Sequence, residues 1–336
     1  MEPGLRFLVV GLGSMGKRRI RNLQALNQTK LAGFDPRADR RDEASTRYGV
    51  EVFDSFERSL EVFQPDALII STSPDLHMQY AFLALRRELH CFIEASVVEG
   101  ERVVELSQAI QKKNLVMVPS CTMRYHPGPM VVHSLIREGR IGKPLNLNYL
   151  TGQYLPDWHP WEHIKDFYVS QRETGGAREI VAFELTWLNE IFGDPRPLGC
   201  VKDKLTDFDA DIDDVYHCLL RYPNQVLANI TVEVISRPRA IRELNVLGST
   251  GRIVFSSEEN CVRYIAVGDE DWTRINLQVG TTEEGYINPE EPYISEMADF
   301  LKAIEIGERK WFPNTLEKDA QILALLNNLE KLSTTK

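Results

Sequence analysis

Short runs of apolar residues alternate with longer segments of helical periodicity through the first third of the chain. The apolar runs predict buried strands at residues 5–10, 31–34, 50–53, 67–70, 90–93 and 115–118. The segments between them predict helices at residues 17–27, 37–48, 55–63, 76–87 and 99–113. Strands that alternate with helices in this way predict a doubly wound α/β domain, with a parallel sheet covered on both faces.

The pattern changes after residue 122. Helices are predicted at residues 127–139 and, after Gly175-Gly176, at 177–192, with a strand at 145–154 between them. Strands then follow one another without helices at residues 198–202, 214–222, 225–235, 242–247, 252–255, 262–267 and 272–278. Period-two alternation in these strands predicts an open, mainly antiparallel sheet, and two last helices are predicted at 293–306 and 315–332. We therefore predict two domains, 1–122 and 123–336, the second of α+β class.

A glycine-rich turn directly follows the first predicted strand. Gly11, Gly13 and Gly16 enclose Ser14 and Met15, a helix follows, and the second strand ends at Asp35. This order is the fingerprint of a Rossmann dinucleotide-binding domain. The glycines permit the tight turn, the approach of the pyrophosphate and close helix–strand packing, while the acid accepts hydrogen bonds from the adenosine ribose. A parallel-sheet turn without a ligand is the alternative.

The choice between NAD and NADP stays open in the sequence. Asp35 favours NAD, because a carboxylate there binds the ribose hydroxyls. Arg37, Arg40 and Arg41 follow closely, and a basic residue at this point can meet the 2′-phosphate of NADP. The arginines are equally consistent with a solvated first turn of the next helix.

Polar residues also follow three later strands of the predicted parallel sheet. They are Ser71, Thr72 and Ser73 after the fourth strand, Glu94 after the fifth, and Ser120-Cys121 after the sixth. Ligands of such sheets bind at the carboxyl ends of the strands. We therefore expect these residues to border the same crevice as the glycine turn.

Composition limits the classes of function. The chain has 336 residues and a formal net charge of −10, with no Lys/Arg block, which argues against nucleic-acid binding. No apolar run is long enough for a membrane span, and the first strand starts at residue 5, so no signal peptide is expected. The five cysteines are scattered without the spacing of a metal site or redox pair. We expect a reduced cytoplasmic protein without a metal.

Taken together, the motifs resemble those of the glucose–fructose oxidoreductase / inositol dehydrogenase family (Gfo/Idh/MocA). The resemblance spans essentially the whole chain. It rests on the glycine turn with Arg18-Arg19, Ser71-Thr72-Ser73-Pro74 with His77, Arg124 with Pro127, residues 138–144, Gly175-Gly176 and residues 248–252. It implies a bound nicotinamide cofactor, a sugar-like small-molecule substrate and homodimers or homotetramers formed through the sheet. The cofactor-binding residues that it implies are Gly11, Gly13, Ser14, Met15, Gly16, Arg18, Asp35, Arg37, Ser71, Thr72, Ser73, His77, Glu94 and Arg124.

Two departures from the family pattern affect the chemistry. The family usually has Glu-Lys-Pro after the fifth strand, with the lysine at the reaction centre, whereas this chain has Glu94-Ala95-Ser96. The family also places an aspartate and a histidine at the start of the central helix, and the histidine position is occupied by Phe183. Neither Ala95 nor Phe183 can transfer a proton, so the usual lysine–histidine chemistry cannot be carried over.

Other ionisable residues are candidates for proton transfer. The catalytic candidates are Glu179 and Glu184 near the start of the central helix, with His159 and Lys165 in the preceding loop. Tyr154, Trp158 and Arg178 are candidates for substrate binding, because aromatic rings can stack on sugars and a guanidinium can hold an anion. Each has a structural alternative, as a solvated charge, an ion pair or packing.

Two classes of function follow. The first is an NAD(P)-dependent oxidoreductase that transfers hydride between the nicotinamide and a secondary alcohol of a sugar, sugar nucleotide or cyclitol, in a role such as surface-sugar biosynthesis. The second is a family member that binds NAD but performs a non-redox reaction or acts as a cofactor-binding partner protein. The intact glycine turn favours the first class, and the missing lysine and histidine favour the second.

Overall fold

The computed structural model describes residues 4–333, which divide into two compact units. The first comprises residues up to Thr122 together with Pro289–Gln321, and the second comprises Met123–Asn288 and the residues from Ile322 onward. The break at residue 122 lies where the sequence pattern changes. Residues 289–321, which the sequence analysis assigned to the second domain, belong to the first unit.

The first unit is built on a six-stranded sheet in which every pairing is parallel. The strand order is β3-β2-β1-β4-β5-β6. The strands are β1 (Phe7–Val10), β2 (Leu31–Phe34), β3 (Glu51–Phe53), β4 (Ala67–Ile70), β5 (His90–Ile93) and β6 (Met117–Pro119). β1 pairs with β2 on one side and β4 on the other, so the chain reverses its direction of winding there. Ligands of such sheets bind at this switch point.

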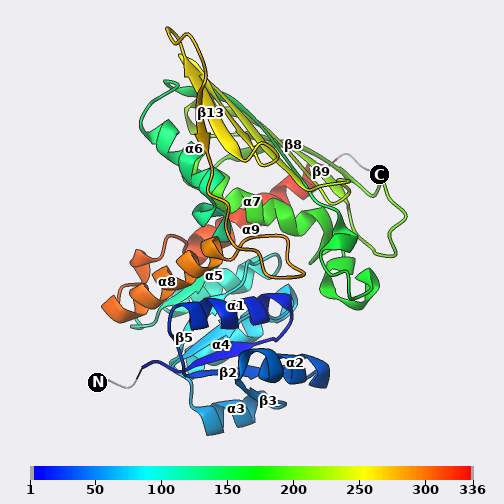
Figure 1. The fold of residues 1–336 in the computed structure, drawn as a ribbon, viewed down its shortest axis with the longest axis vertical. Helices are drawn as coiled ribbons and strands as arrows, with labels where there is room; N and C mark the ends of the chain where they lie inside the picture. Colours follow the sequence, from blue (N-terminus) through cyan, green and yellow to red (C-terminus); the bar gives the residue numbers. More distant parts are fainter. Residues whose placement is uncertain (1–3, 334–336) are drawn as a thin grey trace. The chain divides into compact units, whose positions relative to one another are not determined.

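Helices connect these strands and cover the sheet (Figure 1). They are α1 (Ser14–Ala25), α2 (Ala38–Tyr48), α3 (Phe56–Phe63), η1 (Pro74–Leu76), α4 (His77–Arg86) and α5 (Gly100–Ala109). The later segment adds α8 (Glu291–Ile306), η7 (Arg309–Trp311) and the first residues of α9 (Leu316–Lys331).

Packing explains why α8 belongs to the first unit. Phe300 meets Phe92 of β5 edge to face, with ring centroids 5.6 Å apart. Glu290, at the N-cap of α8, receives hydrogen bonds from Arg18 (3.1 Å) and Arg21 (2.8 Å) of α1. These partners lie more than two hundred residues away along the chain, so local periodicity could not reveal the pairing.

The second unit is built on an eight-stranded sheet of order β14-β13-β12-β11-β7-β10-β9-β8. Its strands are β7 (Pro144–Gly152), β8 (Arg196–Asp203), β9 (Val215–Arg221), β10 (Leu227–Glu233), β11 (Ile241–Gly248), β12 (Gly251–Ser256), β13 (Cys261–Ala266) and β14 (Thr273–Asn276). All pairings are antiparallel except that of β10 with β7. The predicted fold class, Rossmann plus an open and mainly antiparallel α+β domain, is confirmed.

Helices cover one face of this sheet. The helical segments of the second unit are η2 (Thr122–Tyr125), which begins at the unit boundary, α6 (Pro127–Arg137), η3 (Leu155–Asp157), η4 (Ile164–Asp166), η5 (Tyr168–Ser170), α7 (Gly176–Phe192), η6 (Pro223–Gln225) and the end of α9. Of these, η6 forms the turn between β9 and β10. Figure 1 shows α6 and α7 along the same side of the sheet. Tyr149 of β7 and Trp187 of α7 meet edge to face in the buried core between them, at 5.4 Å.

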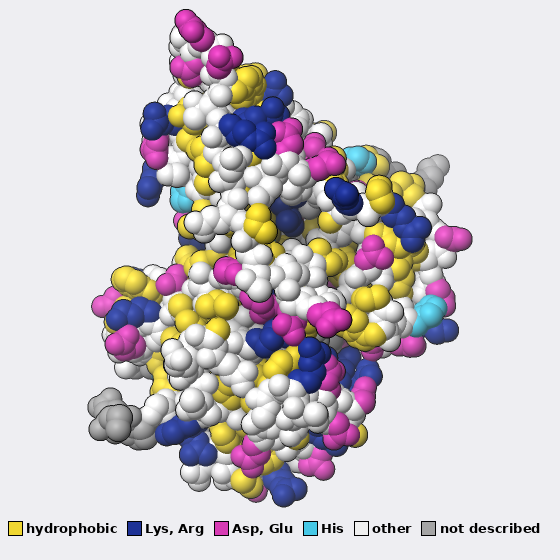
Figure 2. Space-filling model, in the orientation of Figure 1, with side chains coloured by type: hydrophobic (Ala, Val, Ile, Leu, Met, Phe, Trp, Pro, Cys, Tyr) yellow, Lys and Arg dark blue, Asp and Glu magenta, His cyan; other side chains and the backbone are white. Residues whose placement is uncertain are grey.

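Charged side chains of both signs are dispersed over the face shown in Figure 2. Acidic side chains gather at the hairpin between β13 and β14, which carries Asp269, Glu270 and Asp271. All five cysteines are buried with free thiols. Within residues 4–333, no helix is long and apolar enough to cross a membrane, and no cluster of His, Cys, Asp and Glu could hold a metal ion.

Candidate cofactor and proton-transfer sites

The glycine turn joins β1 to α1 in the first unit. Gly11 has φ +91°, and a Cβ there would lie 2.6 Å from the carbonyl oxygen of Ser71. A Cβ on Gly16 would overlap the carbonyl oxygen of Gly11. Both positions therefore require glycine for the fold itself. Gly13 is different, because it has an ordinary φ of −68° and a Cβ there would meet only the guanidinium of Arg40, at 3.6 Å.

Gly13 is also the N-cap of α1, and as a glycine it has no side chain that could cap this helix end. The first N–H groups of a helix have no intrahelical partner and carry partial positive charge, which favours an anion. Ser14 and Met15 occupy the first turn of the helix. The turn therefore provides the space and the donors that a pyrophosphate needs.

Asp35 lies directly after β2 and is 2% exposed. Its Oδ2 accepts a hydrogen bond from the backbone N–H of Leu12 (2.8 Å), and its Oδ1 accepts one from the N–H of Arg37 (2.9 Å). A carboxylate can accept about four hydrogen bonds, so both oxygens retain acceptor capacity. The carboxylate is thus held against the glycine turn, and its role in binding the adenosine ribose stays a prediction.

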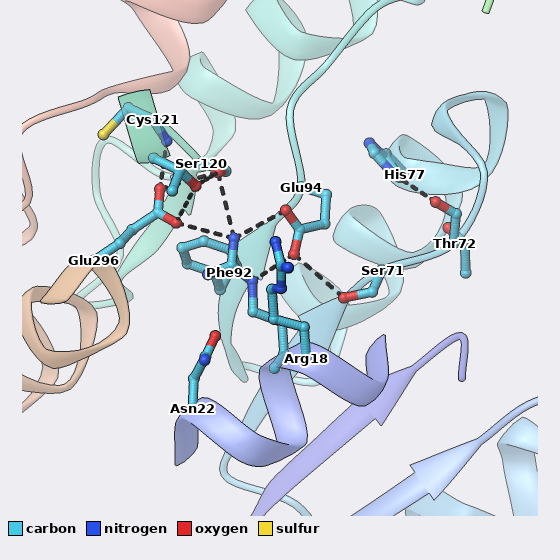
Figure 3. Close-up of polar contacts among 12 residues, drawn as sticks. Arg18, Asn22, Ser71, Thr72, His77, Phe92, Glu94, Ser120, Cys121 and Glu296 are labelled. Carbon is cyan, nitrogen blue, oxygen red and sulfur yellow. Dashed lines mark hydrogen bonds and ion pairs between the residues drawn. The ribbon is translucent and has the colours of Figure 1, made fainter. Parts of the chain in front are cut away.

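The segment after β4 adds polar groups to the first unit. The ring of His77, the first residue of α4, is buried, and its Nε2 lies 3.1 Å from the carbonyl oxygen of Thr72 (Figure 3). Burial lowers the pKa of His77, so the neutral imidazole is favoured at neutral pH. The Thr72 hydroxyl donates to the carbonyl oxygen of Ser73. These contacts fix the loop that precedes α4.

Glu94 belongs to a buried ion-pair network. Both of its oxygens accept hydrogen bonds from Arg19, at 2.6 and 3.0 Å, and the Ser71 hydroxyl donates at 3.4 Å. Arg19 also forms an ion pair with Glu296 of α8, with 2.9 Å between Arg19 Nη2 and Glu296 Oε2. Burial by itself would lower the pKa of Arg19, but the two carboxylates raise it above its usual value. Arg19 is therefore a permanent cation beneath the strand ends.

The carboxylate of Glu296 continues this network (Figure 3). It accepts hydrogen bonds from the hydroxyls of Ser120 (2.9 Å) and Thr122 (2.6 Å) and from the backbone N–H of Cys121. The pairing of Arg19 with Glu296 was not predicted from the sequence. The one local signal was an acid at position 296 within the apolar stripe of α8, next to the buried Met297.

Three predicted cofactor residues have their charged groups engaged elsewhere. Arg18 donates to Glu290, and its guanidinium lies 4.1 Å from the ring centre of Tyr293. Arg37 pairs with Asp39 at 2.6 Å. We assign both side chains to local structure rather than to cofactor binding.

The third of these residues, Arg124, lies in the second unit. Its guanidinium pairs with Glu190 of α7 at 3.0 Å and donates to the carbonyl oxygen of Thr186 at 3.1 Å. These contacts attach η2 to α7, so we assign Arg124 to the packing of the second unit.

Glu179 lies in the first turn of α7 and is the strongest candidate for proton transfer in the second unit. Its Oε1 accepts a hydrogen bond from the Tyr168 hydroxyl at 2.8 Å. Its Oε2 is buried and has no hydrogen-bond partner within residues 4–333. Burial raises the pKa of Glu179 to about 7, and the hydrogen bond from Tyr168 opposes the rise. A carboxyl group that titrates near neutrality is suited to general acid–base work.

The glycine pair before α7 explains how Tyr168 reaches Glu179. A Cβ on Gly175 would overlap the backbone of Val169, so only glycine lets the chain of η5 pack against the helix start. Gly176 has φ +62°, which also favours glycine. The sequence indicated the two glycines but not Tyr168, because a tyrosine in an aromatic loop carries no local signal of its partner.

An aromatic chain leads from Tyr168 to His159. Phe167 meets Tyr168 edge to face at 6.1 Å. The His159 ring is stacked between Phe167 (4.5 Å) and Trp161 (5.1 Å), and its Nδ1 lies 3.4 Å from Glu162 Oε2. The structure therefore places two catalytic candidates, Glu179 and His159, at the ends of one continuous cluster.

Glu184 has a different environment. It is fully buried, and its oxygens receive hydrogen bonds from the Tyr149 hydroxyl (2.6 Å), the Trp187 indole N–H (2.7 Å) and Arg242 (2.7 Å). Burial and the Glu184 carboxylate raise the pKa of Tyr149 well above its usual value. We assign Glu184 to the stability of the second unit, since its partners occupy the carboxylate.

We expect Glu184→Gln to lower the free energy of unfolding by roughly 3–5 kcal/mol, because it leaves the buried charge of Arg242 without its counter-ion. Urea unfolding followed by circular dichroism measures this loss. A large fall in turnover without any loss of stability would contradict the assignment and return Glu184 to the catalytic candidates.

The remaining predicted residues of the second unit divide between packing and exposed positions. Lys165 is 57% exposed and lies 3.7 Å from Asp209. Arg178 donates to Glu330 (2.9 Å), Asn327 (3.1 Å) and a backbone carbonyl, so its guanidinium joins α7 to α9. Phe183, at the family's histidine position, packs against the hydrophobic core.

Tyr154 and Trp158 retain features of a ligand-binding surface. The guanidinium carbon of Arg237 lies 3.5 Å from the ring centre of Tyr154, and Phe208 packs edge to face on the same ring at 5.6 Å. Trp158 is half-buried against the core. Its indole Nε1 is buried without a hydrogen-bond partner in the described part of the chain. Such a donor is available to a ligand hydroxyl.

The residues of the first unit fit a nicotinamide dinucleotide. Gly13 leaves the backbone open where the pyrophosphate approaches, and it provides no capping side chain at the N-terminus of α1. Asp35 lies beside the turn with spare acceptor capacity. A Cβ at Gly13 would occupy the space that this cradle provides.

Comparison with protein families gives two matches. Residues 5–120 match the model described as "Oxidoreductase family, NAD-binding Rossmann fold". Residues 130–254 match the GFO/IDH/MocA C-terminal domain. The two models together cover most of the chain. The first contains all six strands of the parallel sheet, and the second contains β7 to β11 and the first part of β12.

Two curated relatives share parts of the chain. UDP-N-acetylglucosamine 3-dehydrogenase of Acidithiobacillus ferrooxidans is 28% identical over 158 residues, which are 46% of this chain and 47% of the relative. 1,5-Anhydro-D-fructose reductase of Ensifer adhaerens is 27% identical over 115 residues, 33% of this chain and 32% of the relative. The matched segments thus span half or less of the curated relatives.

Among solved structures, a levoglucosan dehydrogenase in complex with NADH and levoglucosan has the same fold. The TM-score is 0.82 at 18% identity, and the match covers 98% of each chain. An oxidoreductase from Agrobacterium radiobacter, in complex with NAD+, L-tartaric acid and magnesium, gives a TM-score of 0.83 at 12% identity, covering 99% of this chain and 97% of the other. At these sequence identities the structural similarity shows that the fold is shared, and nothing about activity.

Proposed function

This chain belongs to the Gfo/Idh/MocA family of NAD-binding oxidoreductases, and from that premise we propose that it transfers hydride between a nicotinamide cofactor and a secondary alcohol. The substrate is a sugar, a sugar nucleotide or a cyclitol. The single observation that carries the proposal is the glycine cradle, with Gly11 held at φ +91° and Asp35 fixed against it by the N–H of Leu12.

The substrate class is supported by the relatives and by the second unit. The names of the relatives refer to a sugar nucleotide and to anhydrosugars. In this chain, Tyr154 and Trp158 offer aromatic surface, and the Trp158 indole is a buried donor without a partner among the described residues. Aromatic rings with nearby hydrogen-bond donors are suited to polyhydroxylated ligands.

The proposed reaction separates the movements of hydride and proton. When it is bound, NAD supplies the nicotinamide carbon that accepts the hydride from the alcohol carbon. Glu179 accepts the hydroxyl proton through Oε2 as the carbonyl forms, and returns it in the reverse reaction. Tyr168 orients the carboxylate through its hydrogen bond to Oε1. His159, at the far end of the aromatic cluster, is the second candidate for carrying the proton onward.

Binding and turnover together test the proposal. We expect calorimetry to detect NAD, and NADH absorbance to rise when NAD and a substrate of the proposed class are mixed with the protein. Failure to bind either NAD or NADP would overturn the cofactor role.

A second function is favoured by one observation, the replacement of the family's lysine and histidine by Ala95 and Phe183. A protein that binds NAD and catalyses a redox-neutral reaction, or that serves as a cofactor-binding partner protein, would keep the cradle and lose those groups. Product analysis by mass spectrometry separates the two functions, because oxidation of an alcohol removes two hydrogens whereas a redox-neutral change leaves the oxidation state unaltered.

We also propose that the chain forms homodimers or homotetramers through the face of the eight-stranded sheet opposite α6 and α7. Leu219, Leu227 and Leu247 on β9, β10 and β11 are between 40% and 50% exposed, and strand alternation places them on this face. Surfaces with several large exposed apolar residues are commonly interfaces.

We expect Leu219→Glu to shift the protein toward monomer, because a charge would be buried in the interface. Light scattering at micromolar concentration measures the mass. Val279→Glu, at an apolar residue that is 86% exposed in the loop after β14, is the matched control and should leave the mass unchanged. A monomeric wild-type protein would contradict the proposal.

A further inference from the structure

Two of the five cysteines lie directly opposite each other on neighbouring strands of the second unit. Cys200 of β8 is the register partner of Cys218 of β9, in an antiparallel pairing (Figure 1). The spacing of the cysteines along the sequence predicted no redox pair. Strand register brings this pair together, and no local spacing reveals it.

The next pair along the same two strands shows that opposed side chains on this face meet. Lys202 of β8 opposes Tyr216 of β9, and the Lys202 ammonium nitrogen lies 5.7 Å from the centre of the Tyr216 ring. Side chains two positions apart on a strand point to the same face of the sheet. Cys200 and Cys218 therefore face each other on that side too, where they are 4% and 1% exposed within the hydrophobic core.

The backbone separation of such a pair suits a disulfide bond. Directly opposed residues of antiparallel strands have Cα atoms about 5.5 Å apart in hydrogen-bonded pairs and about 4.5 Å apart in the others. Disulfides span Cα separations of about 4.4–6.8 Å. Both kinds of pair fall within this range, so the strands need not slide or separate for Cys200 and Cys218 to be joined.

The two thiols differ in acidity. Interaction with the Cys218 thiol lowers the pKa of Cys200, against the effect of burial. The pKa of Cys218 is raised well above its usual value by Cys200 and by burial. Because the thiolate is the reactive form of cysteine, Cys200 is the sulfur that reacts first with an oxidant.

Cys200 also lies where the sheet opens most readily. β8 is the last strand of the sheet. Among the described residues, its outer side carries one isolated bridge, from Cys200 to Ser333. Local opening of a single bridge costs far less than opening a central strand, so a small oxidant can reach Cys200 from this edge.

We propose that Cys200 and Cys218 form a reversible disulfide, with hydrogen peroxide as the oxidant. The Cys200 thiolate attacks one peroxide oxygen, the O–O bond breaks, and a sulfenic acid forms with release of hydroxide. The Cys218 sulfur then attacks the sulfenic sulfur, so that the S–S bond forms and the S–O bond breaks to release a second hydroxide. The two thiol protons convert both hydroxides to water, and one peroxide is reduced for each disulfide formed.

The disulfide closes the hairpin of β8 and β9. The loop of this hairpin, residues 204–214, supports the start of α7. The N–H of Asp211 donates to the carbonyl oxygen of Ser170 at 2.8 Å, and the N–H of Ala177 donates to that of Asp213 at 3.1 Å. A cross-link at the base of the hairpin restricts the unfolded chain, so the stability of the second unit depends on its redox state. This inference goes beyond the proposed function and does not depend on it.

Peptide mapping of the purified full chain tests the inference. The folded, reduced protein is treated with hydrogen peroxide, free thiols are blocked with N-ethylmaleimide in denaturant, and the chain is digested with trypsin without reduction. Cleavage after Lys202 and Lys204 leaves Cys200 and Cys218 on separate peptides, residues 179–202 and 205–221. We expect a species with the summed mass of the two peptides less two hydrogens, which dithiothreitol separates.

Thermal unfolding gives a second readout. Oxidation should raise the midpoint by roughly 5–10 °C, and reduction should reverse the rise. Cys200→Ala and Cys218→Ala should each abolish the linked species and the rise. Cys261→Ala is the matched control, because Cys261 of β13 opposes Ser256 and Asn276 instead of a cysteine. It should respond to peroxide as the wild type does.

Three results would overturn the inference. In the first, the wild-type peptides stay unlinked or are recovered only as sulfinic and sulfonic acids. In the second, the linked species forms only when peroxide is added in urea, so that the pairing belongs to the unfolded chain. In the third, Cys218→Ala shows the same rise in midpoint as the wild type. If an alanine variant does not fold, the peptide map of the wild type decides alone.

Discussion

Glu179→Gln is expected to lower turnover by ~10²–10⁴-fold while leaving NAD affinity unchanged. Glutamine preserves the size of the side chain and can still accept a hydrogen bond from Tyr168, but it cannot accept a proton. Among the described residues of α7, Glu179 is the titratable residue whose side chain has a buried oxygen without a hydrogen-bond partner, while its other oxygen accepts from Tyr168. Steady-state kinetics and calorimetry on the same preparation measure the two effects.

The matched control for this variant is Tyr168→Phe, which removes the hydrogen bond to Glu179 and keeps the ring. Because Tyr168 orients the carboxylate rather than carrying the proton, turnover should fall by less than in Glu179→Gln. Equal turnover in Glu179→Gln and the wild type would show that another group transfers the proton, with His159 the next candidate.

The pH dependence follows from the raised pKa of Glu179. Oxidation of an alcohol needs the deprotonated carboxylate, so turnover in that direction should rise with pH through about 7. This limb of the profile should vanish in Glu179→Gln. A wild-type profile that is flat between pH 5 and 9 would contradict the role of Glu179 as the base.

Stability should change with pH in the opposite sense. The folded-state pKa of Glu179 lies above its unfolded value, so between about 4.5 and 7 the folded protein binds more protons than the unfolded chain. Stability contributed by this group is therefore present below pH 4.5 and is lost as the pH rises through about 7. Asp319, whose pKa burial raises to about 7, adds a parallel loss. Comparison with Glu179→Gln isolates the contribution of Glu179.

Gly13→Val is expected to weaken NAD binding by at least about a hundredfold. The branched side chain would occupy the space through which the pyrophosphate reaches the N-terminus of α1. Gly13 has an ordinary φ and an open environment, apart from the flexible side chain of Arg40. The variant should therefore fold, which substitutions at Gly11 or Gly16 would not guarantee.

Calorimetry and thermal unfolding distinguish a blocked site from a damaged fold. Gly199→Val is the matched control, since a Cβ at Gly199 of β8 meets only the end of the Leu219 side chain, at 4.0 Å. It should retain NAD affinity. Wild-type affinity in Gly13→Val would remove the glycine turn from the cofactor site.

The sequence predicted most of the fold because apolar runs, helical periodicity and period-two alternation are local properties of the chain. Runs such as residues 67–70 and alternation such as that of β10 identify the strands without knowledge of their neighbours. The assignment of α8 to the first unit was not predicted, because the contacts of Glu290 and Glu296 with α1 span the length of the chain. No window of sequence contains both partners.

The same distinction applies to the candidate sites. The glycine turn and Asp35 form one contiguous motif, so the sequence predicted them together. Glu179 and Glu184 looked alike in sequence, as acids near the start of one helix. The two acids differ in their hydrogen-bond partners. Glu184 accepts a hydrogen bond from Arg242 of a distant strand, whereas Oε2 of Glu179 has no partner among the described residues. Solvation and long-range pairing decide which acid is available for chemistry.

The most direct test of the central claim is the oxidation of a substrate coupled to NAD reduction. The purified chain would be incubated with NAD and a panel of sugars, sugar nucleotides and cyclitols, and NADH formation would be compared with product mass. We predict one NADH for each substrate molecule that loses two hydrogens, with the rate reduced in Glu179→Gln. A product of unchanged oxidation state with no net NADH, formed while NAD stays bound, would contradict the claim.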